Sequence, residues 1–69
     1  MTEHVYKKIE IVGSSAASID DAIHAAVQKA AATVKNLRWF EVSQVRGEIE
    51  DGKVAHFQVT MMLGFRLED

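Results

Sequence analysis

The sequence contains no cysteine, which excludes disulfide bonds and metal sites built on thiolates. Histidine is scarce as well, and His4, His24 and His56 show no HxxxH or HxH spacing. A chain of 69 residues buries only about 60% of the surface that its unfolded form exposes. Small domains of this kind are usually stabilised by a disulfide, a metal, a cofactor or a partner subunit. We therefore expect support from self-association or from a bound ligand.

Several other features are absent. No apolar run approaches the roughly 18 residues that cross a bilayer, and the start, "MTEHVYKKIE", has no hydrophobic signal region. The net charge is −2 with both signs interspersed, so no basic face favours nucleic acid. The apolar fraction of 48% is typical of a folded protein. We expect a cytoplasmic domain that binds neither membrane nor nucleic acid.

Apolar periodicity predicts a strand and then a helix. Residues 4–12, "HVYKKIEIV", alternate with the period of two that marks a strand, and "GSSAAS" follows as a loop. Ser18 with Asp21 three residues later resembles a capping box, so a helix is expected from Ile19 to Asn36 or Leu37. Its apolar stripe consists of Ile19, Ile23, Ala26, Val27, Ala30, Val34 and Leu37.

The second half of the chain predicts a hairpin of two strands. Asp51-Gly52 between extended segments is a strong turn signal, because glycine accepts a positive φ. Counting back from a two-residue turn places Trp39 opposite Gly64. The apolar positions change phase between residues 42 and 45, which indicates a β-bulge near Ser43.

These elements predict an α+β fold of order β-α-β-β, a single domain over residues 1–69 in which a three-stranded antiparallel sheet packs on one amphipathic helix. Trp39 and Phe40 are neighbours on a strand and point to opposite faces, yet one helix covers only one face. The face without cover is expected to carry Trp39, Val54, His56, Gln58, Thr60, Met62, Gly64 and Arg66. Such a face predicts a binding surface or a subunit interface.

Four segments in this order resemble the dodecins, small flavin-binding proteins that assemble into hollow shells of twelve subunits. The segments are "VYK…EIVG", "WFEV", "VRG…DG…FQV" and "GFRLE", and together they span nearly the whole chain. The resemblance implies a flavoprotein, a homododecamer that stores and protects FMN or riboflavin without catalysing a reaction. Because indole is easily oxidised, we further expect Trp39 to quench the excited flavin by electron transfer. Coenzyme A, which some relatives bind elsewhere on the shell, is a further partner that the resemblance allows.

The resemblance also implies four cofactor-binding residues. Trp39 of "WFEV" matches the tryptophan that stacks on the isoalloxazine ring, with two symmetry-related tryptophans bracketing a pair of flavins. Gln58 of "FQV" matches the glutamine at the pyrimidine edge, and Arg46 and Arg66 match arginines that line the FMN site. Arg38 departs from the aspartate common before this tryptophan, and we do not include it in the site.

The chemistry of these residues suits a flavin. Indole stacks on a flat aromatic ring, and Gly64 has no side chain to block a plate lying on that ring. A glutamine amide matches alternating acceptors and donors, and arginine binds carbonyl or phosphate oxygens. Two other hypotheses remain: a structural homo-oligomer with no bound flavin, and an enzyme that turns flavin over. Against an acid–base enzyme, no carboxylate or nucleophile is placed by spacing to assist His56.

Overall fold

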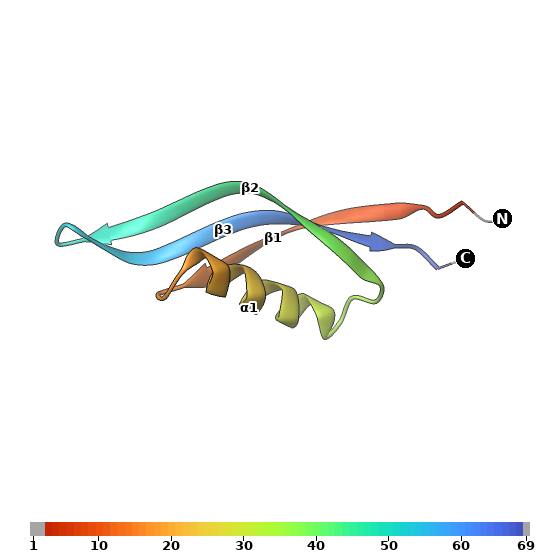
Figure 1. The fold of residues 1–69 in the computed structure, drawn as a ribbon, viewed down its shortest axis with the longest axis horizontal. Helices are drawn as coiled ribbons and strands as arrows, with labels where there is room; N and C mark the ends of the chain where they lie inside the picture. The colour runs from red at the N-terminus through yellow and green to blue at the C-terminus, as the bar shows by residue number, and fades with distance from the viewer. Residues whose placement is uncertain (1–2, 69) are drawn as a thin grey trace.

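A computed structural model describes residues 3–68 of the chain and confirms the predicted α+β fold (Figure 1). The elements are β1 (Tyr6–Ser15), α1 (Ile19–Ala31), β2 (Leu37–Glu50) and β3 (Lys53–Arg66). The three strands form one antiparallel sheet in the order β1-β3-β2, and α1 packs mainly against β1 and β3. The domain predicted over residues 1–69 includes residues 1, 2 and 69, which lie outside the described part.

Strand β1 continues three residues beyond the predicted end at residue 12, into the expected loop. Gly13, Ser14 and Ser15 all pair with β3. At Gly13 the helix comes close, since a Cβ added there would lie 2.9 Å from the Ala26 Cβ and 3.1 Å from the Ala22 carbonyl carbon. The glycine therefore lets α1 approach the sheet at Ala22, which is completely buried although the predicted stripe omits it.

The helix begins as predicted and ends earlier than predicted. Ser18 is the N-cap, with its hydroxyl accepting the backbone N–H of Asp21 at 2.9 Å. Ser15 completes this cap from β1, because its hydroxyl donates to the Asp21 carboxylate at 2.7 Å. The predicted end at residue 36 or 37 is wrong: α1 ends at Ala31.

The early end of α1 has a local cause. Beyond Ala31 the chain tightens through bonds such as that from the Thr33 N–H to the Ala30 carbonyl at 3.1 Å, and Asn36 has a φ of 65°. A residue in the left-handed region ends a helix, and asparagine tolerates that region well. Val34 follows α1 and lines the cleft between α1 and β1, and Leu37 packs against the core from β2. Both therefore keep the apolar spacing of a continuing helix without belonging to it.

The hairpin confirms the predicted turn and the predicted bulge. Asp51 and Gly52 both have positive φ, 52° and 75°, as a type I′ turn requires. The register shifts between Val42 and Gln44, so Ser43 is the extra residue. A second shift leaves Ala55 as an extra residue of β3, and the two shifts cancel, so that Trp39 does lie opposite Gly64.

Because of the irregularity at Ala55, Val54 lies on the opposite face of the sheet from the one predicted. This residue was expected on the face away from the helix. It pairs with Ile49, and both line a hollow on the helix side together with Ile19 and Phe57. A single extra residue is enough for this change, because side chains alternate between the two faces of a strand.

The molecule is extended and its core is small. Fully buried apolar side chains of the described residues are Ala22, Val59, Met61 and Leu63. The Cα radius of gyration is 14.5 Å, compared with about 11 Å expected for a compact domain of this length. Strands of 14 residues are about 46 Å long, whereas a helix of 13 residues is about 20 Å. The turn end of the hairpin therefore projects past α1 (Figure 1).

Candidate functional site

Trp39 lies on the sheet face that is turned away from α1, which we call the outer face. Its indole covers Gly64 of the neighbouring strand: a Cβ added at Gly64 would lie 2.5 Å from Cδ2 of the indole and closer still to Cε2 and Cζ2. The missing side chain thus gives space to the indole itself. The sequence-based explanation, that Gly64 leaves room for a ligand on the ring, assigned this space to the wrong group.

The indole has one covered face and one open face. The β3 backbone at Gly64 lies beneath it, and Tyr6 of β1 meets it edge-on, with ring centroids 5.3 Å apart and an interplanar angle of 68°. Trp39 nevertheless stays 37% exposed. One chain therefore offers one face of one indole for stacking.

Glu41 holds the polar edge of the indole. The Nε1–H of Trp39 donates to Oε2 of Glu41 at 2.8 Å, and Lys8 Nζ of β1 donates to the two oxygens of the same carboxylate at 3.3 and 3.4 Å. The bond from Trp39, followed by the bond from Lys8, lowers the pKa of the Glu41 carboxyl from its usual value. The carboxylate is accordingly ionised at neutral pH and links Trp39 of β2 to β1.

Sequence reasoning missed this cluster of Tyr6, Lys8 and Glu41 around Trp39. One signal was available, because Glu41 follows Trp39 by two residues and so shares its face. No local signal reveals the other two, since Lys8 and Tyr6 approach Trp39 only through the pairing of β1 with β3.

Gln58 and Arg46 lie together in another part of the outer face. They are direct cross-strand partners on β3 and β2, and both are exposed. Six positions of β3 separate Gln58 from Gly64, which is about 20 Å along a strand. The structure thus brings Arg46 to Gln58 and brings neither of them to Trp39 within one chain.

Arg66 belongs to the end of the sheet that carries Trp39. It follows Gly64 by two residues on β3, so it projects from the same face, and its cross-strand partner is Tyr6. Its backbone N–H donates to the Asn36 carbonyl at 3.1 Å, and its carbonyl accepts from the Asn36 amide at 3.3 Å. Arg38 is the extra residue of a register shift beside Trp39.

His56 has a carboxylate neighbour that spacing did not reveal. Its Nδ1 lies 3.7 Å from Oε1 of Glu48, because the irregularity at Ala55 makes these two residues cross-strand partners. The side chains are 50% and 62% exposed, and the pair lies toward the turn end of the hairpin, away from Trp39.

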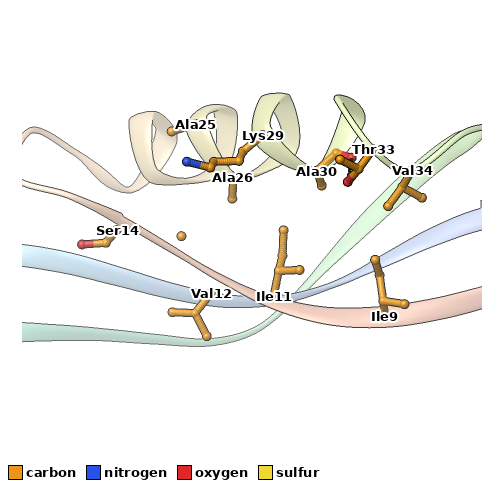
Figure 2. A pocket seen from close by; sticks show the side chains of 11 residues that line it. Ile9, Ile11, Val12, Ser14, Ala25, Ala26, Lys29, Ala30, Thr33 and Val34 are labelled. Carbon is orange, nitrogen blue, oxygen red and sulfur yellow. Dashed lines mark hydrogen bonds between the residues drawn. The ribbon is translucent and has the colours of Figure 1, made fainter.

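The helix covers less of the apolar face than predicted. On the helix side of β2, Phe40, Val42 and Val45 remain 49%, 43% and 49% exposed, because α1 packs over β1 and β3. Along the opposite edge, β1 and α1 enclose a cleft of about 490 Å³. Figure 2 shows its apolar walls, with Ile9 and Ile11 facing the helix and Lys29 at its rim. Apolar surface is therefore exposed at both edges of the sheet, on the helix side of β2 and in the cleft between β1 and α1.

Within residues 3–68, the structure lacks two further classes of site. No group of three or more His, Cys, Asp or Glu side chains there is arranged to hold a metal ion. In the same range, no helix has the length and apolar character needed to cross a membrane.

Comparison with known proteins gives a consistent result. The family model described as Dodecin matches residues 5–68. The dodecin of Thermus thermophilus is 46% identical over 65 residues, which is 94% of each chain. The structure of dodecin from Streptomyces coelicolor has 54% identity and a TM-score of 0.93, covering 100% of this chain and 99% of its own. A calcium dodecin from Mycobacterium tuberculosis, described with a calcium-binding site, has 29% identity and a TM-score of 0.79, with 93% and 91% coverage.

Proposed function

Since the chain belongs to the dodecin family, we propose that it binds FMN or riboflavin, stores it and quenches its excited state. Dodecins are small binding proteins, and we propose no catalytic turnover for this chain. The single observation that carries the proposal is the Trp39 indole, which is held flat on Gly64 with its other face open. A flat, rigid and accessible aromatic surface is what a planar aromatic ligand needs for stacking.

The separation of the four site residues implies a site shared between chains. Along β3, Trp39 lies about 20 Å and Arg66 about 26 Å from Gln58 and Arg46, farther than one isoalloxazine ring reaches. All four can contact one ligand only if copies of the chain meet across their outer faces. Such a meeting also supplies the second indole, so that stacked flavins are enclosed from both sides.

Self-association is supported by the shape of the chain and by its family. The extended shape and the half-exposed apolar residues of β2 leave too much apolar surface for a stable monomer of this size. Dodecin membership indicates assembly with copies of itself, and we propose the homododecamer.

Each of the four residues would contribute a different interaction. Trp39 stacks on the ring, adding roughly 0.5–1.5 kcal/mol beyond the burial of apolar area. The Gln58 amide offers an acceptor and two donors to the pyrimidine edge, and Arg46 and Arg66 offer forked donors to carbonyl or phosphate oxygens. Because indole is easily oxidised, Trp39 can pass an electron to the light-excited flavin and recover it, so quenching leaves no net reaction.

A combined spectroscopic and hydrodynamic experiment tests this function. Size-exclusion chromatography with absorbance detection should show an oligomer that carries flavin or takes up added FMN, and FMN fluorescence should fall on binding. Trp39→Ala should weaken binding and restore fluorescence. The matched variant Trp39→Phe keeps a ring for stacking without the readily oxidised indole, so it should retain more binding than Trp39→Ala while still losing much of the quenching.

The second candidate is a structural homo-oligomer that binds no flavin. The exposed apolar side chains of Phe40, Val42 and Val45 on β2 favour it, because their burial would drive assembly without any ligand. An oligomer that stays colourless and leaves FMN fluorescence unchanged would establish it. Repeating the titration with coenzyme A tests the further ligand allowed by the family, and sustained oxidation of an added electron donor would instead indicate an enzyme.

A further inference from the structure

The orientation of Trp39 is not determined by packing alone. Gly64 beneath the ring and Tyr6 at its edge define the plane of the indole. The torsion that turns an aromatic ring about its Cβ–Cγ bond is broad and roughly two-fold, so packing against a flat backbone leaves a flipped ring accessible. The group that distinguishes the two orientations must contact the one polar atom of the indole, Nε1.

Glu41 is the group that makes this contact. It accepts the Nε1–H of Trp39 at 2.8 Å, a good distance for a hydrogen bond to a carboxylate. The carboxylate is itself held by Lys8 of β1, the edge strand on the other side of β3. Since the Glu41 and Lys8 side chains are 48% and 47% exposed, their ion pair contributes little to stability, and its main effect is to keep the carboxylate in place.

We propose that Glu41 is a positioning residue that, anchored by Lys8, holds the Trp39 indole in one of its two ring orientations and so fixes where the indole ring system lies beneath a stacked flavin. The proposal rests on the proposed function for its effect on flavin and goes beyond it in assigning a role to residues that do not touch the ligand. A preorganised ring loses less freedom on binding, so the affinity is higher.

The test compares variants of Glu41 with variants of Glu10. Glu10 is a matched control because it flanks Met62 on the outer face from β1, just as Glu41 flanks it from β2, and no hydrogen bond joins it to Trp39 in the described structure. Glu41→Ala should weaken FMN binding roughly 2- to 10-fold, as expected for the loss of one hydrogen bond. Glu41→Gln keeps an acceptor for the indole and should recover part of the loss, while Glu10→Ala should bind like the parent.

A measurement without ligand separates this proposal from the proposed function. Trp39 is the only tryptophan, so its indole N–H gives a single cross-peak in a ¹H–¹⁵N spectrum of the assembled protein. Glu41→Ala should shift this peak and lower the steady-state anisotropy of indole fluorescence, whether or not FMN binds. If the parent fails to bind FMN while the indole still responds in this way, the proposed function is wrong and the positioning role stands.

Two results would contradict the positioning role of Glu41. If the indole peak and its anisotropy are the same in Glu41→Ala and Glu10→Ala, Glu41 does not position Trp39. The same conclusion follows if both variants weaken FMN binding equally, because the effect would then come from lost charge. A Glu41→Ala chain that fails to assemble can be replaced by Lys8→Met, which removes only the anchor and should cause a smaller shift of the same peak.

Discussion

Replacing Gly64 by alanine should weaken flavin binding without altering any residue proposed to contact the flavin. The added Cβ would lie 2.5 Å from Cδ2 of Trp39 and closer to two further ring atoms, whereas carbon atoms pack at about 3.5–4.0 Å. The indole must therefore move by at least about 1–1.5 Å. A displacement of that size would also break the 2.8 Å hydrogen bond to Glu41 unless the carboxylate followed.

The expected magnitude follows from the loss of a well-placed stacking surface. An aromatic pair contributes roughly 0.5–1.5 kcal/mol beyond its area, which corresponds to about a 2- to 12-fold increase in Kd. The assay is titration of FMN fluorescence, carried out on variants that elute like the parent from a size-exclusion column.

A double-mutant cycle shows whether the effect passes through Trp39. Gly64→Ala should have little further effect in a Trp39→Ala background, because no ring remains to be displaced. The reasoning is refuted if Gly64→Ala alone leaves both FMN affinity and the indole spectrum unchanged, or if it weakens binding equally with and without Trp39.

Three further outcomes follow from the structure. Gly13→Ala should destabilise the fold by about 1–3 kcal/mol, since its Cβ would meet the α1 backbone at Ala22, and thermal unfolding measures this; an unchanged midpoint would contradict the close packing. Gly52→Ala should cost roughly 1–2 kcal/mol because φ there is 75°, with no effect on the affinity for FMN. The folded pKa of Glu41 is lowered from the usual value of 4.5, so the contribution of its negative charge to the bond with Trp39 is fully present above pH 4.5 and is lost as the pH falls through the lower folded value. The indole N–H peak should therefore move as the solution is acidified, and this movement should be absent in Glu41→Gln.

Local chemistry made much of the fold predictable. The Ser18 cap and the Asp51-Gly52 turn depend on a few neighbouring residues, and both occur where expected. The predicted pairing of Trp39 with Gly64 is also confirmed, although partly because an unrecognised irregularity at Ala55 offsets the bulge at Ser43. Counting along two strands cannot detect a pair of shifts that cancel.

Features that depend on distant parts of the chain could not be predicted in this way. The helix was extended too far because Val34 and Leu37 keep helical spacing from outside the helix: Leu37 packs against the core from β2, and Val34 lines the cleft between β1 and α1. The bare helix-side surface of β2 was missed, because the pattern of Phe40 and Val42 shows which face they share and not where α1 crosses it.

The four candidate ligand residues follow from the resemblance to the dodecins and stay predictions. By itself, the sequence determined the order of the elements, the turn and the alternation of faces. All of these arise from backbone preferences and from side-chain types within a few residues of each other. Only the tertiary structure decided how Trp39 is held, with Gly64 beneath its ring and Glu41 and Lys8 at its polar edge. Those relations depend on the pairing of β1 with β3, which are separated by most of the sequence. They also depend on the position of the single helix, which packs mainly on β1 and β3 and leaves the opposite face of the sheet uncovered.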